Sequence, residues 1–155
     1  MSAPTTWRDY ADRLTAEQIA LMEYCEANEL PPGIASPESH INAALTMIRE
    51  NETQAACAHI PTPPDALDVP APWLPWDDDV AQRTYTCWAQ QMPGVAVTII
   101  GGQYSDGRPV YREIYVEDSD DACDMNAERA RILGRLLVDA ADALDRLNGV
   151  TPPFI

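Results

Sequence analysis

The order of apolar and polar residues predicts helical structure at the start of the chain. Apolar residues recur at helical spacing over residues 7–14 and again over residues 19–25. Between these two runs, Thr15 and Gln18 fit a capping box, in which the threonine hydroxyl accepts from the Gln18 N–H and the glutamine side chain reaches back. We therefore expect a helix that begins at this box and ends near Asn28.

A second helix is predicted from Ser36 to near His59. Ser36 is a favourable N-cap, and Pro37 fits the first helical position, where no N–H is needed. Its expected buried face carries Ile41, Ala44, Leu45, Ile48 and Ala55.

Six prolines between residues 61 and 76 break the helical pattern. Proline lacks the backbone N–H, so this stretch should not form regular hydrogen bonds. Trp73 and Trp76 lie within it, and a floppy linker would seldom carry two tryptophans. We expect a strap on the surface of the core, ended by the acidic run 77–79.

Three strands are predicted next, over residues 83–92, 95–100 and 110–117. β-Branched and aromatic residues dominate them, and the near-continuous apolarity of the second marks it as central. Turn residues separate the strands, and Gly101-Gly102 is a candidate β-bulge.

Alternation in the third strand predicts one apolar and one mixed face. Val110, Ile114 and Val116 should point one way, with Arg112 among them, while Tyr111, Glu113, Tyr115 and Glu117 point the other. On the second side we expect Thr84, Thr86 or Trp88 beside the tyrosines, and exposed aromatic residues are common binding anchors. The alternative is that the N-terminal helices or the Trp73/Trp76 strap cover this side.

The last helix has the clearest pattern and should run from Asn126 to Gly149. Its broad apolar face comprises Ile132, Leu133, Leu136, Leu137, Ala140, Ala141, Leu144 and Leu147. Charges four residues apart, Arg135 with Asp139 and Asp142 with Arg146, are placed to pair.

The predicted fold is therefore α+β: two N-terminal helices, a proline-rich strap, a three-stranded antiparallel meander and a long C-terminal helix packed on the sheet. The length of 155 residues fits one domain over residues 1–155. Within it we expect a helical part (1–60), a Pro/Trp-rich connection (61–79) and a βββα part (80–149).

Charge restricts the partners. Ten basic and 25 acidic residues give a net charge of −15. Such a surface repels phosphate backbones and anionic membranes, so we expect no direct nucleic-acid or membrane binding. A partner with a basic surface, or a cation, would be attracted.

The chain contains no lysine, so every cationic side chain is an arginine. A Walker A loop and a Schiff-base enzyme both require lysine, and neither is compatible with this sequence. Gly101-Gly102 begins no dinucleotide-binding motif. His40 and His59 stand in no nucleophile motif. We expect no enzyme, no catalytic residues and no cofactor.

Four cysteines lie far apart, at Cys25, Cys57, Cys87 and Cys123, with no C-x-x-C pair. Zinc sites usually pair their ligands at short spacing, so the scattered thiols and His59 predict no metal site. With no signal-like start and no apolar run of membrane-spanning length, we expect a cytoplasmic protein with reduced thiols.

The acidic residues 117–124 place Asp118 and Asp120 at the first and third positions of an EF-hand-like loop. The later positions carry Ala122, Cys123 and Arg129, so the match fails. A solvated acidic loop before the last helix is the expected structure, in keeping with its charge preference at that end.

Three segments carry a resemblance to a known group. They are Trp7-Arg8-Asp9-Tyr10 with the following Leu14–Gln18, the hairpin segment Gly102–Arg108, and the helix over Ala127–Leu147. In these the chain resembles uncharacterised small proteins of mycobacteria and their bacteriophages. The resemblance implies an accessory phage or prophage product that binds a host protein, and it implies no activity or catalytic residues.

The leading hypothesis is a non-enzymatic, acidic protein-interaction module that binds and modulates a host or phage protein. Its expected partner-binding surface comprises Tyr111, Tyr115, Trp73, Trp76, Asp118, Asp120 and Asp121. Two alternatives stay open: an acidic nucleic-acid mimic that occupies a DNA-binding protein, and a virion or assembly component.

Overall fold

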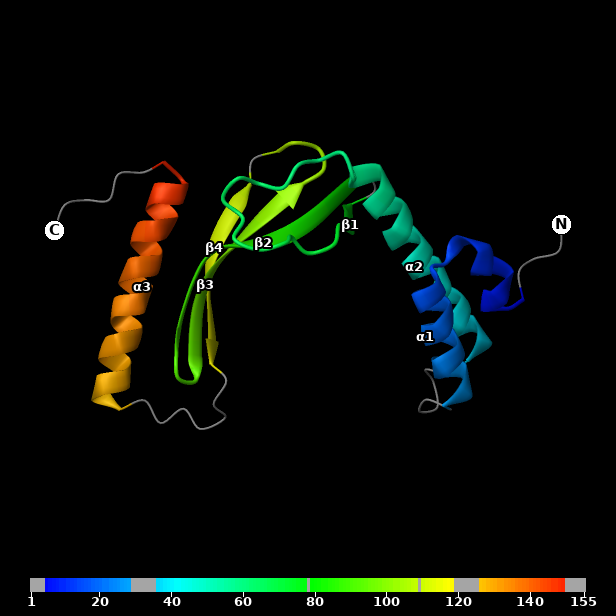
Figure 1. Cartoon of the computed structure of the whole chain (residues 1–155), viewed down its shortest axis with the longest axis horizontal. Helices are drawn as coiled ribbons and strands as arrows, with labels where there is room; N and C mark the ends of the chain where they lie inside the picture. The colour runs from blue at the N-terminus through cyan, green and yellow to red at the C-terminus, as the bar shows by residue number, and fades with distance from the viewer. Residues whose placement is uncertain (1–4, 29–35, 78, 109, 119–125, 150–155) are drawn as a thin grey trace. The chain divides into compact units, whose positions relative to one another are not determined.

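A computed structural model describes residues 5–28, 36–77, 79–108, 110–118 and 126–149 of the chain. These residues form two compact units (Figure 1). One contains residues 1–59 and 73–75, and the other contains residues 60–72 and 76–155. The expectation of a single domain stays a prediction.

The N-terminal unit is helical. Its elements are a 3₁₀ helix, η1 (Trp7–Arg13), and the α-helices α1 (Ala16–Ala27) and α2 (Pro37–Cys57). The first apolar run therefore forms its own short helix, so three helical elements precede the sheet where two were predicted. The capping box that begins α1 is confirmed, because the Gln18 N–H donates to the Thr15 hydroxyl over 3.2 Å and the Thr15 N–H donates to the Gln18 side chain over 2.9 Å.

A small core holds these helices together. Trp7, Met22 and Ala44 are buried at its centre, with Leu14 and Ile19 packed against them. One residue from each helix enters this centre, which explains why the short η1 is retained.

An antiparallel sheet of four strands in the order β1-β2-β3-β4 forms the base of the second unit, which contains β1 from Trp76 onward. The strands are β1 (Leu74–Asp77), β2 (Val80–Met92), β3 (Val95–Tyr104) and β4 (Tyr111–Asp118). The prediction of three strands is wrong in this respect. β1 forms within the proline-rich segment because an edge strand leaves one side unpaired, where Pro75 is tolerated.

The sheet has a bulge, but in β2 rather than at the glycines. Thr86 pairs with Ile100 and Trp88 with Ile99, so Cys87 is an extra residue. Gly101 and Gly102 keep regular register with both neighbouring strands. They are needed for another reason: a Cβ on Gly101 would lie 2.5 Å from the ring of Tyr85, and one on Gly102 would overlap the ring of Tyr111.

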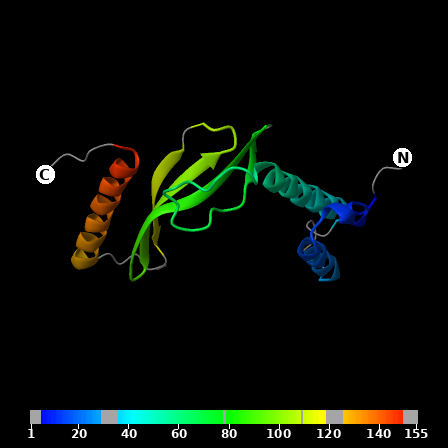
Figure 2. The ribbon, with the colours of Figure 1, turned by 45° about the horizontal axis from the view of Figure 1, so that its top comes forward.

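The long helix α3 (Ala127–Leu147) packs against one face of the sheet, beside which it lies in Figures 1 and 2. Ala140 and Ala143 are buried, and Leu133, Leu136, Leu144 and Leu147 pack around them against Val95, Val97 and Ile99. The predicted packing of the last helix is therefore present. Its two predicted ion pairs are not, since no salt bridge joins Arg135 to Asp139 or Asp142 to Arg146.

The strap covers the rest of the same face. Arg112 and Asp65 form an ion pair of 2.7 Å, with side chains only 17% and 15% exposed. The carbonyl of Pro61 accepts from the side chains of Arg83 and Gln103. The segment over residues 60–66 thus lies on the sheet, as a surface strap was expected to do, and only β1 departs from that expectation.

Candidate functional site: the open face of the sheet

One face of the sheet lies beneath α3 and the strap, and among the described residues of this unit no helix packs on the other. On β4, Ile114 points into the core with Ile99, its partner on β3. The neighbouring residues Tyr111, Glu113 and Tyr115 point to the opposite side, as predicted from their alternation. We call this side the open face; it carries Gln82, Tyr104, Tyr111, Glu113, Tyr115 and Glu117.

The bulge decides which β2 side chains reach the open face. Thr84 and Thr86 pair with Gly102 and Ile100 and lie on it. Trp88 does not: the extra residue at Cys87 shifts the alternation by one, and Trp88 packs into the core instead. The expectation of Trp88 beside the tyrosines is therefore wrong.

An aromatic row crosses the open face from β1 to β4. The ring centroids of Trp76 and Tyr104 are 6.3 Å apart in an edge-on contact, and those of Tyr104 and Tyr111 are 6.0 Å apart. Trp76 is 63% exposed. The guanidinium of Arg108 lies 4.6 Å from the centre of the Tyr104 ring, so this ring already holds one cation.

Two polar contacts fix Tyr111 and Arg108 in place. Gln82 is buried and donates to the Tyr111 hydroxyl over 2.6 Å. Asp106 binds Arg108 with a salt bridge of 2.6 Å. Burial raises the pKa of Tyr111, and the nearby Tyr104 adds to the effect. The phenol therefore stays neutral and can accept this bond at physiological pH.

The β4 end of the open face is acidic as well as aromatic. Tyr115 is 45% exposed and donates to Glu113 over 3.0 Å. This hydrogen bond raises the pKa of Tyr115. Glu117, two residues further on, is exposed. Carboxylates beside exposed rings are a suitable surface for a cationic side chain.

The structure brings together only part of the predicted binding surface. Trp76, Tyr111 and Tyr115 lie on the open face. Trp73 belongs to the N-terminal unit, where it is buried and its carbonyl accepts from Gln54 over 2.6 Å. Asp118 ends β4. Its side chain lies outside the described residues, as do Asp120 and Asp121.

Three residues of the surface, Gln82, Tyr104 and Arg108, were not predicted. Their position depends on strand register, because Gln82 pairs with Tyr104 and Gly102 pairs with Tyr111. Gly102 was the one residue that could have indicated this surface, because a glycine in a strand often marks a place where a large neighbouring ring lies over the backbone.

Of the two tryptophans of the strap, only Trp76 lies on the open face, where its ring contacts that of Tyr104, so the alternative that the Trp73/Trp76 strap covers this face holds at one edge only. Ala66 packs into the core on the covered face, and the backbone N–H groups of Leu67 and Ala71 bond to the edge of β2. Only Asp68 reaches across, to the Thr86 hydroxyl at 2.9 Å. Tyr115 and Trp76 stay exposed.

A second group of polar side chains lies beneath the strap. Tyr85 and Cys87 are buried close to the Asp65–Arg112 ion pair. Burial and the charge of Asp65 raise the pKa of both the phenol and the thiol. A protonated, buried thiol is a poor nucleophile, so the raised pKa gives Cys87 no sign of an activated thiolate.

The remaining candidate residues do not converge. His40 is half-buried on α2, and His59 is exposed just beyond it. Cys25 and Cys57 are free thiols, while Cys123 lies outside the described residues. Across the described ranges, no three His, Cys, Asp or Glu side chains are grouped as metal ligands would be.

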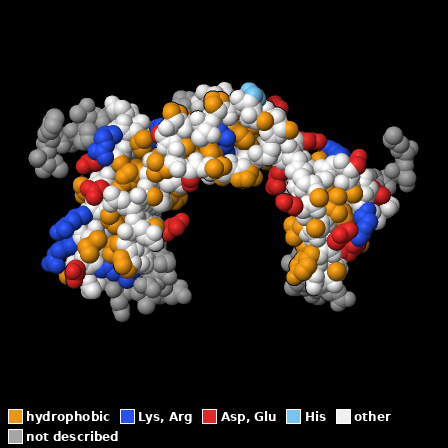
Figure 3. Space-filling view, in the orientation of Figure 1, with side chains coloured by type: hydrophobic (Ala, Val, Ile, Leu, Met, Phe, Trp, Pro, Cys, Tyr) orange, Lys and Arg blue, Asp and Glu red, His pale blue; other side chains and the backbone are white. Residues whose placement is uncertain are grey.

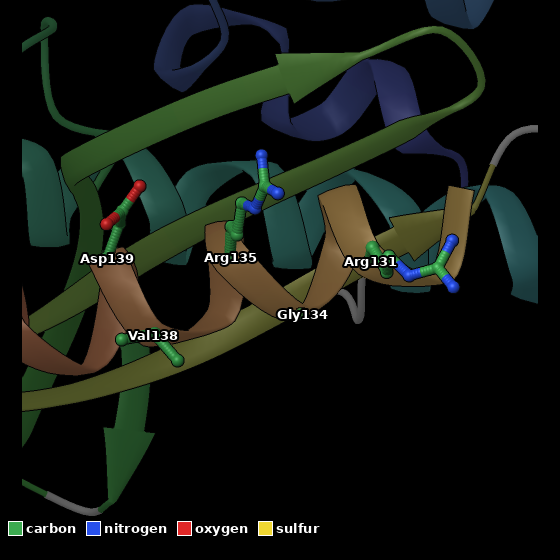
Figure 4. A pocket seen from close by; sticks show the side chains of 5 residues that line it. All are labelled: Arg131, Gly134, Arg135, Val138 and Asp139. Atoms are coloured by element: carbon green, nitrogen blue, oxygen red, sulfur yellow. The ribbon is translucent and has the colours of Figure 1, made fainter. Parts of the chain in front are cut away.

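Two hollows border α3. One, of about 490 Å³, lies between the β2–β3 turn and the start of the helix, where Met92, Asn126 and Arg129 line it. The other lies on the helix itself around Gly134, between Arg131, Arg135 and Val138 (Figure 4). Neither lies on the open face.

No protein-family model, no curated protein and no solved structure matches the chain. None of the helices in the described ranges has the length and apolarity that a membrane crossing needs.

Proposed function

We propose that the protein is a non-enzymatic interaction module that binds a basic segment of another protein on the open face of its sheet. The observation that supports this most is the aromatic row of Trp76, Tyr104 and Tyr111, with the exposed Tyr115 further along β4 on the same face. Tryptophan and tyrosine are enriched among the residues that contribute most to protein–protein affinity.

The chemistry of the open face favours cationic side chains. Arg108 on the Tyr104 ring is an internal example of the contact that a partner's arginine would make. Glu113 and Glu117 supply carboxylates next to Tyr115, and the net charge of −15 would steer a basic partner towards the molecule.

The identity of the partner as a host or phage protein is our proposal from the sequence resemblance alone. A cytoplasmic site of action belongs to the same proposal.

A binding titration with a defined probe tests the module. The probe is a short fluorescent peptide in which arginine alternates with valine, and its counterpart carries glutamate in place of arginine. We expect the arginine peptide to bind the full chain and the glutamate peptide not to bind. The double variant Trp76→Ser/Tyr115→Ser should weaken binding at least about tenfold, the effect of losing one strong anchor.

The matched control is Tyr24→Ser, which removes an equally exposed ring, 64% accessible, from α1. Both variants should keep their folding stability within about 0.5 kcal/mol, as exposed substitutions usually do. Equal binding of the two peptides, or equal losses for the two variants, would contradict the proposal.

The nucleic-acid mimic receives less support. It requires carboxylates in a row at phosphate-like spacing. On the side of the molecule shown in Figure 3, acidic side chains lie among arginine and apolar side chains in both units. Glu113 and Glu117 on the open face are separated by Tyr115.

A further inference from the structure

The outer face of α3 is a second surface, separate from the open face, on which no described residue of the same unit packs. The helix packs on the sheet through Leu136, Ala140 and Ala143, so the opposite side of the helix faces away from the sheet. There Val138 is 54% exposed and Gly134 and Ala141 are exposed as well. Leu137 borders this strip at 37% exposure. A short strip of small and apolar residues, within residues 134–141, therefore lies at the middle of the solvent side of the helix.

Charges divide this outer face into two halves. Arg131 and Arg135 lie in its N-terminal half, while Asp142 and Asp145 lie in its C-terminal half. Figure 3 shows arginine side chains along the outer edge of the first half of α3 and acidic side chains nearer its C-terminal end. In the described part of the chain, these four side chains make no hydrogen bond or salt bridge.

This distribution does not serve the helix itself. A helix is stabilised by acidic groups near its N-terminus and basic groups near its C-terminus. Glu128 and Arg146 at the two ends follow that rule, whereas the four outer-face charges run in the opposite order. The helix dipole therefore does not account for their order, and the four charges are available to pair with those of another molecule.

A second copy of the same helix, laid antiparallel, satisfies all four charges. With the two-fold axis near Val138, Arg131 of one copy meets Asp145 of the other, and Arg135 meets the turn that carries Asp142. Each pair occurs twice by symmetry. A parallel arrangement would place like charges together, which disfavours it.

The centre of the strip is shaped for close approach. The hollow in Figure 4 exists because Gly134 has no side chain between Arg131 and Val138. A Cβ added at Gly134 would meet nothing within 4 Å, so the position is open to an incoming group. Ala141 of an antiparallel copy falls opposite this hollow, and small residues let two helices approach closely.

We propose that α3 is a self-association surface, on which two copies of the chain pair through antiparallel α3 helices about a two-fold axis near Val138. Apolar contact between the strips contributes affinity, and the arginine–aspartate pairs set the direction. Because both copies are strongly acidic overall, the contact is expected to be reversible and dependent on concentration.

A charge-exchange experiment on the full chain tests this pairing. One variant carries Arg131→Asp and Arg135→Asp, and the other carries Asp142→Arg and Asp145→Arg. Sedimentation velocity over a concentration series should show a dimer for the wild type and at least about tenfold weaker dimerisation for each variant alone. An equimolar mixture of the two should form a heterodimer, detected by mass in native mass spectrometry. In this pair the acidic outer face of one variant meets the basic outer face of the other.

Two further variants distinguish a specific contact through the outer face of α3 from a general effect of changed net charge. Arg49→Asp changes an exposed charge on α2 and should leave dimerisation unchanged. Gly134→Leu should fill the hollow and weaken the dimer while the helical circular dichroism signal is retained. A wild type that stays monomeric at every concentration, or two charge variants that fail to associate when mixed, would overturn the proposal.

Discussion

The two faces of the sheet are made from the same strands but differ in what covers them. On the covered face, Val97 and Ile99 are fully buried beneath α3. On the open face, their neighbours Thr98 and Ile100 are only half-buried, and Tyr115 remains exposed. The comparison separates two parts of one sheet: one face supplies the apolar burial that stabilises the fold, and the other is the surface on which we propose that a partner binds.

Tyrosine over glycine occurs on both faces and shows the same contrast. Tyr85 lies over Gly101 within the core, next to Cys87, whereas Tyr111 lies over Gly102 on the open face. Tyr85 is 3% exposed, and Tyr111 is only half-buried. An identical pairing is thus buried on one side and part of the candidate binding surface on the other.

Truncating one isoleucine on each face should give the largest difference in unfolding free energy between the two faces. Ile99→Ala removes a fully buried side chain and leaves a cavity, so we expect a loss of about 3 kcal/mol in unfolding free energy. Ile100→Ala, on the open face, should cost about 1 kcal/mol or less because its environment is partly solvent. Urea unfolding of both variants measures this, and equal losses would show that the open face is packed like a core.

Replacing Gly101 or Gly102 by alanine should give a smaller difference in stability between the two faces. Gly101→Ala forces the buried Tyr85 ring and the Cys87 sulfur to shift, at a cost of about 1–3 kcal/mol. Gly102→Ala should cost less, because Tyr111 can swing towards solvent. Chemical denaturation checks the order.

The double variant Gly102→Ala/Tyr111→Ala is the control for this pair, since removing the ring removes the clash. It should show no further loss from the added methyl group. If Gly102→Ala is instead the more damaging of the two single changes, the assignment of the two rings to covered and open faces is in error.

Alkaline pH should lower the stability of the fold, and the buried Tyr85 and Cys87 of the covered face should contribute most to the loss. Burial raises the pKa of Tyr85 and of Cys87, so the folded state holds their protons more tightly than the unfolded state. Their contribution to stability is complete below about pH 9, the ordinary thiol range, and is lost as the pH rises beyond it. The slope is on the order of 1 kcal/mol per pH unit for each group.

Urea unfolding between pH 8 and pH 11 should therefore show declining stability, and Tyr85→Phe should make the decline shallower. Tyr115→Phe on the exposed surface should leave the decline nearly unchanged. A steeper loss for the Tyr115 variant would contradict the account.

Much of this fold could be predicted from local pattern. The capping box at Thr15, the N-cap at Ser36 and the periodicity of α3 each depend on residues close in sequence, and all three helices begin where expected. The alternation of Tyr111 and Tyr115 was also read correctly, since side chains in a regular strand alternate without exception.

The remaining features depend on pairing between distant residues. The bulge at Cys87 is defined only by its partners on β3, and it moves Trp88 from the predicted surface into the core. β1 forms only because β2 offers a free edge. The surface around Tyr104 depends on the register that brings Gln82 and Tyr111 beside it, and the sequence does not determine that register locally.

Hydroxyl-radical footprinting read by mass spectrometry tests the central claim, that one sheet face is left open for recognition, most directly. The account predicts rapid labelling of Trp76 and Tyr115 in the folded protein, with Tyr85 labelled only after unfolding. Protection of Trp76 and Tyr115 in the isolated chain, to the same degree as Tyr85, would contradict it.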